Sequence, residues 1–160
     1  MSTPITPYSA QLGDREPLKA IRDTLERIRI LAGGWTPAQF ERTYAPGKWS
    51  ARQILAHLAQ TEMALGTRAR MALTTPQYLA QAWDQDSWIA CEARVSGPEA
   101  LEALLALGRM NAAFFEGLST SDRETPLSHP EYGSLTLDWI LHQLAGHQIN
   151  HLRQLEAIAA

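Results

Sequence analysis

Four long stretches of the chain place apolar residues three and four positions apart, the spacing of an α-helix with one buried face. Each stretch follows a residue whose side chain can cap a helix, and two of these caps belong to complete capping boxes, Ser50 with Gln53 and Ser96 with Glu99. The spacing predicts helices over about residues 17–32, 51–73, 97–116 and 135–158, with Asp14, Ser50, Ser96 and Ser134 as their caps.

The segments between these helices are irregular in sequence. Residues 76–95 mix Trp and Tyr with Asp, Ser and Pro, which predicts a long crossover with one or two short helical turns. Residues 1–13 contain Pro, Ser and Thr and are expected to form an extended lead-in. No strand-like alternation of useful length occurs. We therefore expect an all-α fold: a four-helix bundle with a long crossover between the second and third helices, built as a single domain over residues 1–160.

Composition narrows the class of protein. The 160 residues carry 14 Lys and Arg against 17 Asp and Glu, a formal net charge of −3, so the basic surface of a nucleic-acid-binding protein is not expected. No apolar run is long enough to span a bilayer, and the N-terminus lacks the features of a signal peptide. The single cysteine, Cys91, lies among apolar residues and is expected to be a packed, unreactive thiol. We therefore expect a cytoplasmic protein that binds neither nucleic acid nor a membrane.

Three of the five histidines fall on inward or bordering faces of the predicted helices. His147 and His151 are four residues apart on the last helix, which places their side chains one above the other. His57 borders the apolar stripe of the second helix, whereas His142 points to the opposite, solvent-facing side of the last helix. Three imidazoles around one open position are the ligand pattern of catalytic zinc sites. The alternative is that they are hydrogen-bonded core residues, the more frequent state of a histidine near an apolar face.

Carboxylates offer weaker candidates for chemistry. Glu62 leans inward but lies on the other edge of its helix from His57, so we do not count it as a metal ligand. Asp84 and Asp138 have no spacing that places them near the histidines. The sequence therefore indicates no general base, and no catalytic residue is assigned.

Aromatic residues and a fifth histidine are candidates for the walls of a pocket. Trp49 and Trp83 could both line it, although a position in the core is equally consistent for Trp83. His129 precedes Pro130 in a predicted loop, where it could close over the pocket or stabilise a turn.

Three segments in this order resemble the DinB superfamily: residues 49–59 (WSARQILAHLA), 129–133 (HPEYG) and 147–155 (HQINHLRQL). In that family a helix preceded by Trp supplies one His, and the last helix carries two His four residues apart, followed by a Gln-Leu or Gln-Ile pair. The resemblance covers nearly the whole chain. It implies a four-helix bundle with a divalent transition metal ion, zinc or nickel, bound by His57, His147 and His151.

The resemblance also bears on function. Members of the superfamily include transferases that use low-molecular-weight bacterial thiols, and a thiol that coordinates a metal is deprotonated. The favoured hypothesis is therefore a thiol-dependent S-transferase that acts on a small-molecule substrate. The alternative is a metal-dependent hydrolase, because a bound metal also lowers the pKa of water. A non-enzymatic alternative is a metal-binding stress-response module, whose helical faces could form a homodimer.

Overall fold

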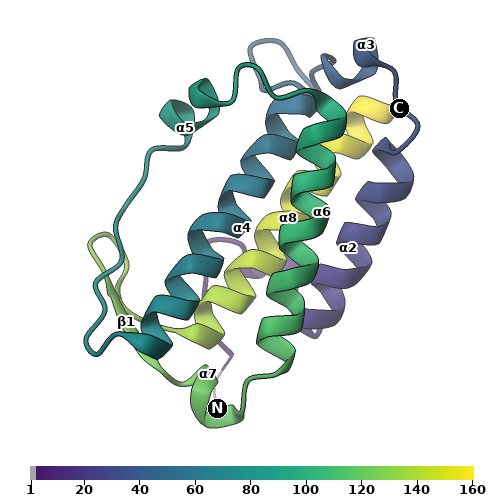
Figure 1. Ribbon diagram of the computed structural model, residues 1–160. Helices are drawn as coiled ribbons and strands as arrows, with labels where there is room; N and C mark the ends of the chain where they lie inside the picture. The colour runs from purple at the N-terminus through teal and green to yellow at the C-terminus, as the bar shows by residue number, and fades with distance from the viewer. Residues whose placement is uncertain (1–2) are drawn as a thin grey trace.

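The computed structural model describes residues 3–160 and confirms the predicted all-α four-helix bundle (Figure 1). Its long helices are α2 (Pro17–Ala32), α4 (Ala51–Thr74), α6 (Gly97–Glu116) and α8 (Leu137–Ala159). α4 packs against α6 and α8, and α2 packs against the same two helices. α2 and α4 therefore occupy opposite corners of the bundle.

The connection between α4 and α6 runs along the length of the bundle, as predicted, and makes these two helices parallel (Figure 1). It contains one short helix, α5 (Gln85–Cys91), capped by the carboxylate of Asp84. Two backbone hydrogen bonds tie the connection to β1 (Pro126–His129): the Ala80 N–H donates to the Ser128 carbonyl at 2.8 Å, and the Ser128 N–H donates to the Tyr78 carbonyl at 3.0 Å. The crossover is thereby held beside the segment that precedes α8.

Two of the four predicted helix caps are wrong, and each true cap lies two residues later. α2 is capped by Glu16 rather than Asp14, and α8 by Thr136 rather than Ser134. A capping side chain accepts N–H groups two or three residues after it, so Asp14 and Ser134 lie too far from the first turns. Both predicted capping boxes are confirmed.

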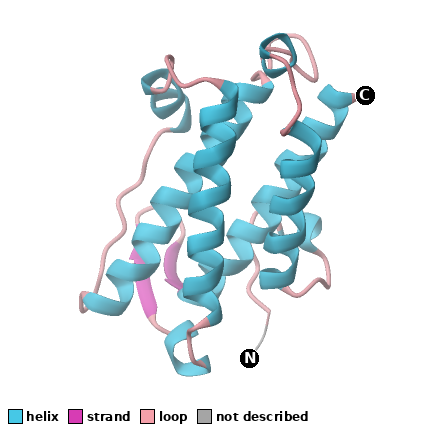
Figure 2. Cartoon of the chain, turned by 45° about the vertical axis from the view of Figure 1, so that its right-hand side comes forward, coloured by secondary structure: helices cyan, strands magenta, loops and turns pink. Residues whose placement is uncertain are grey.

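A short antiparallel hairpin, formed by β1 and β2 (Gly133–Thr136), contradicts the expectation that the chain holds no strand (Figure 2). Each strand has four residues, too few for an alternating pattern to stand out in a loop. Leu127 pairs with Leu135, and both side chains are buried against the bundle. Gly133 has a φ of 72°, the left-handed conformation that glycine adopts without strain at such a turn.

The N-terminal segment is packed on the bundle, and the expected extended lead-in is wrong in part. Met1 and Ser2 fall outside the described residues, but α1 (Ser9–Leu12) is a short helix that packs against α8. The indole N–H of Trp139 donates to the Ile5 carbonyl at 3.0 Å and holds the segment in place. Two more short helices, α3 (Pro37–Phe40) and α7 (Thr120–Arg123), lie in the connections after α2 and α6.

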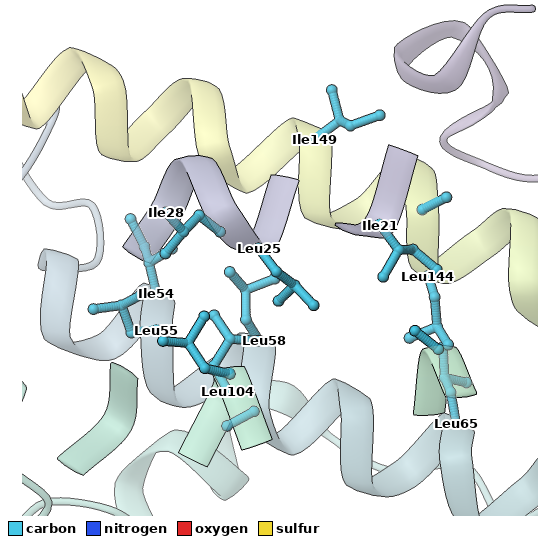
Figure 3. Packing of buried hydrophobic residues seen from close by; sticks show 14 of the residues in the cluster. Ile21, Leu25, Ile28, Ile54, Leu55, Leu58, Leu65, Leu104, Leu144 and Ile149 are labelled. Carbon is cyan, nitrogen blue, oxygen red and sulfur yellow. The ribbon is translucent and has the colours of Figure 1, made fainter. Parts of the chain in front are cut away.

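A continuous apolar core joins the long helices. Leu25 of α2, Leu58 of α4 and Leu104 of α6 meet in it (Figure 3), and burial of each such side chain contributes roughly 1.5–3 kcal/mol. Cys91 lies outside the core and is exposed, because α5 buries only Ile89. The expectation of a packed thiol is therefore wrong. Within residues 3–160 no helix is long and apolar enough to cross a membrane.

Candidate metal centre

Three buried histidines meet between α4 and α8 in the interior of the bundle. His57 comes from α4, and His147 and His151 come from α8. The Nε2 atom of His147 lies 3.0 Å from Nε2 of His57 and 3.1 Å from Nε2 of His151. One candidate ligand atom from each histidine lies within 4.8 Å of the other two. The structure thus brings together the three histidines that the sequence analysis singled out.

Burial keeps these imidazoles uncharged. It lowers the pKa of His57 to about 3, and the neighbouring His151 adds to the effect. It lowers the pKa of His147 well below the ordinary value for histidine, with smaller contributions from the other two rings. It also lowers the pKa of His151, although a hydrogen bond with Gln154 opposes this shift. Neutral imidazole is the form that coordinates a metal ion.

The second nitrogen of each ring lies away from the cluster. Nδ1 of His151 lies 2.7 Å from Oε1 of Gln154, so Nδ1–H donates there and the Nε2 lone pair faces the cluster. Nδ1 of His57 and Nδ1 of His147 are buried, and no described residue offers them a hydrogen bond. Packing orients these two rings instead: the centroid of Trp49 lies 4.8 Å from that of His57, and the centroid of Tyr8 lies 5.1 Å from that of His147.

The geometry fits a divalent metal ion. Three nitrogens bound tetrahedrally at about 2.0–2.1 Å would lie about 3.3 Å from one another, close to the two Nε2–Nε2 distances of 3.0 and 3.1 Å. No carboxylate or thiol belongs to this group within the described chain. Three neutral nitrogen ligands suit a borderline-soft ion and leave a coordination position for an exogenous ligand.

A pocket of about 300 Å³ opens onto this cluster at His57 and His147. Much of its wall is aromatic, formed by Tyr8, Trp83, Tyr132 and Trp139. Polar and charged side chains supply much of the rest of the lining, and a cleft of about this volume is in the range of a small-molecule site.

The pocket settles three sequence-based expectations. Trp83 lines it, with its ring centroid 5.9 Å from that of His57. His129 stabilises a turn, one of the two roles considered for it, since its Nδ1 accepts the N–H groups of Glu131 and Tyr132, and it also forms part of the pocket wall. No spacing in the sequence placed Asp84 near the histidines, but it lines the same pocket, because the crossover carries it back along α4.

Two other polar residues stay outside the cluster, as expected. Glu62 is buried in a separate network, where its carboxylate accepts hydrogen bonds from the side-chain amides of Asn111 and Gln148. His142 does not join the histidine cluster, but its expected exposure is wrong: its side chain is 12% exposed and lies against Asp138.

The sequence analysis assigned no role in the site to three residues that the structure places there. Gln154 stands one helical turn after His151, a spacing that could have identified it as a partner. Arg68 continues the face of α4 that carries His57, and it lines the pocket. Tyr8 had no signal in the sequence, because only the packing of the N-terminal segment brings it to His147.

Fold and site together define a class of protein: a four-helix bundle with a buried three-histidine cluster suited to a divalent metal ion. The chain belongs to the DinB superfamily, whose family model matches residues 20–155.

Relatives of the chain carry names that refer to metals. A protein of Bacillus licheniformis named "Putative metal-dependent hydrolase" is 29% identical over 162 residues, which cover 96% of this chain and 92% of the relative. A protein of Oceanobacillus iheyensis with the same description is 26% identical over 121 residues, which cover 75% of this chain and 70% of the relative.

Two solved structures share the fold. YfiT from Bacillus subtilis, described as "a probable metal-dependent hydrolase with an unusual four-helix bundle topology", matches with a TM-score of 0.80 and 18% identity, covering 99% of this chain and 90% of YfiT. The mycothiol-dependent maleylpyruvate isomerase matches with a TM-score of 0.73 and 15% identity, covering 94% of this chain and 63% of the isomerase.

Proposed function

We propose that the protein is a metal-dependent enzyme in which Nε2 of His57, His147 and His151 hold a divalent transition ion, zinc or nickel. The observation that carries this proposal is the convergence of three neutral imidazoles where a pocket opens. The names of the relatives are consistent with a bound metal. In the protein as proposed, the whole chain is a single domain, and its partner is a small molecule.

We further propose that the reaction is S-transfer from a low-molecular-weight thiol to a small-molecule electrophile. A divalent ion at this site would lower the pKa of a thiol or a water that coordinates it. The sulfur would then form a bond to the electrophilic carbon, the leaving group would depart with its electron pair, and the thiol proton would pass to solvent.

The surroundings of the histidines favour a thiol as the nucleophile. The two carboxylates that line the pocket, Asp84 and Glu131, are both exposed, and Asp84 is engaged as the cap of α5. Neither is a buried general base, so the nucleophile would have to be ionised by the metal alone, and a thiol with an ordinary pKa of about 8.5 needs a smaller shift for this than water at about 15.7. The structural likeness to a mycothiol-dependent enzyme supports the same choice. Hydrolysis is the second candidate, and the names of the relatives favour it.

Metal analysis of variants tests the ligand set. His57→Ala, His147→Ala and His151→Ala should each lower the metal content of the purified protein after dialysis against a fixed concentration of free zinc or nickel. His142→Ala is the matched control, since His142 lies on α8 but outside the cluster. Unchanged metal content in the three variants would refute the assignment.

Cobalt substitution tests the reaction. If a thiol binds at the metal, the cobalt-loaded protein should gain a sulfur-to-metal charge-transfer band in the near ultraviolet when a small thiol is added. The same thiol should react with an electrophile faster in the presence of the loaded protein than with the His151→Ala variant. A hydrolase would show no band and a metal-dependent hydrolysis with a midpoint near pH 7. No band and no rate with cysteine, glutathione and sugar-linked thiols would refute S-transfer.

A further inference from the structure

Arg68 is a buried cation at the wall of the same pocket. It lies on α4, where His57, Thr61, Leu65 and Arg68 form one face and all line the pocket. Eleven residues separate Arg68 from His57, about 16 Å along the helix axis. The lining of the pocket therefore runs along this face of α4 from His57 to Arg68.

The guanidinium has more donors than its neighbours use. Arg68 is only 8% exposed, and its one hydrogen bond to a described residue runs from Nη2 to the Gln81 carbonyl in the crossover. Within residues 3–160 no carboxylate lies within salt-bridge distance of it, although the more exposed Arg22 and Arg29 each have a glutamate partner. Burial of a guanidinium without a directly paired carboxylate is costly, and an arginine offers five donors. The unused donors therefore remain for a group that enters the pocket.

The charge around Arg68 favours an anion with a single charge. Among the described residues of the lining, Arg68 is the one arginine or lysine, and the acidic ones are Asp84 and Glu131, both exposed. The two carboxylates would repel a doubly charged phosphate at this wall more strongly than a singly charged ligand. A carboxylate carries one charge and two acceptor oxygens, which match the planar guanidinium.

We propose that Arg68 forms an anion subsite and that the protein acts on small molecules that carry a carboxylate. This proposal rests on the function proposed above, and it assigns recognition to Arg68 and reaction to the histidine end of the pocket. The aromatic walls contributed by Tyr8, Trp83 and Trp139 would enclose the part of the ligand between the two ends. The carboxylate could belong to the thiol or to the electrophile, since both would enter this pocket.

Binding of matched pairs of probes tests the subsite. Phenylacetate and phenylacetamide differ by a carboxylate and carry no thiol, whereas N-acetylcysteine and its amide form the corresponding thiol pair. Dissociation constants would be measured by calorimetry with metal-loaded and metal-free protein. For at least one pair, wild-type protein should bind the carboxylate about tenfold or more tightly than the amide, the effect of a hydrogen bond to a charged group. The ratio of the amide dissociation constant to the carboxylate dissociation constant should fall to near one in Arg68→Gln and be partly kept in Arg68→Lys.

Controls separate recognition from folding. Arg153→Gln removes an exposed arginine of α8 that does not line the pocket, and it should leave both ratios unchanged. Unaltered binding of phenylacetamide to Arg68→Gln would show an intact pocket. If Arg68→Gln does not fold, the ¹⁵N resonances of the Arg68 guanidinium in wild-type protein should shift with phenylacetate but not with phenylacetamide.

The outcomes are distinct. A loss of discrimination in the thiol pair alone places the carboxylate on the nucleophile, and a loss in the phenylacetate pair alone places it on the electrophile. Equal ratios in wild type and Arg68→Gln for both pairs, or no guanidinium shift, would overturn the subsite. If the three histidine variants bind as much metal as the wild type, only the proposed function is overturned. The phenylacetate measurement on metal-free protein still tests the subsite at Arg68.

Discussion

Gly146 of α8 lies directly against the backbone of Tyr8. A Cβ atom at Gly146 would lie 2.5 Å from the Tyr8 carbonyl oxygen and 2.7 Å from the Tyr8 Cβ, closer than real atoms approach. The absence of a side chain at this position therefore lets the N-terminal segment approach α8. The adjacent His147 then contacts the Tyr8 ring edge to face, at an interplanar angle of 77°.

The variant Gly146→Ala should displace the N-terminal segment. Because backbone atoms meet the new Cβ, the contact cannot be relieved by rotation of a side chain, and we expect a loss of about 1–3 kcal/mol in the free energy of unfolding. Urea unfolding measures the loss, and hydrogen exchange of residues 8–13 reports the displacement. Gly34→Ala is the control, since its Cβ would meet nothing within 4 Å. Unchanged exchange in residues 8–13 of Gly146→Ala would contradict the packing.

Stability of the metal-free protein should fall as the pH falls below about 6.5. An unfolded histidine binds a proton near that pH, whereas the pKa of His57 is lowered to about 3 in the folded protein. Between these values the unfolded state holds more protons, so acid favours unfolding. His57 alone should cost about 2 kcal/mol at pH 5, from the same difference in pKa. Urea titrations from pH 8 to pH 5 measure the slope, which should be shallower in His57→Gln. Equal slopes would contradict a buried, neutral His57.

Gln154 should strengthen metal binding without touching the metal. Its Oε1 accepts the Nδ1–H of His151 and so keeps the other ring nitrogen, Nε2, free to bind. Loss of such a partner typically weakens metal affinity by about 10–100-fold, which is the effect expected for Gln154→Leu. Competition with a chromophoric chelator measures the affinity. The control is Arg153→Leu, which alters the exposed neighbour on the same helix and should not change the metal affinity. Equal affinities in the two variants would show that Gln154 does not support metal binding.

Glu62 should stabilise the bundle without being a metal ligand. Its carboxylate accepts a hydrogen bond of 2.6 Å from Asn111 on α6 and another from Gln148 on α8, so it connects three helices. Glu62→Ala leaves the buried Gln148 amide without an acceptor, leaves the Asn111 amide with the Glu62 main-chain carbonyl alone, and opens a cavity, for an expected loss of about 2–5 kcal/mol. Glu102→Ala, an exposed glutamate on α6, is the control for urea unfolding. The metal content of folded Glu62→Ala at saturating metal should equal that of wild type, and a deficit would make Glu62 part of the centre.

The long helices could be predicted because local interactions specify them. Apolar spacing and the capping boxes at Ser50 and Ser96 act within one or two helical turns, so they can be recognised from the sequence alone. The pairing of His147 with His151 is equally local, since four residues make one turn. The predicted cap at Ser134 failed because that residue lies in β2.

The remainder of the site depended on contacts between distant segments. His57 meets His147 only because α4 packs against α8, and Tyr8 reaches His147 only because Gly146 admits the N-terminal backbone. Arg68 and Asp84 share a pocket because backbone hydrogen bonds to the hairpin hold the crossover along α4. Helical periodicity and caps are set by neighbours in the sequence, so the sequence by itself determined the helices and one histidine pair. The third histidine, the pocket and its charged walls were decided by tertiary packing, because the energy of those contacts depends on residues far apart along the chain.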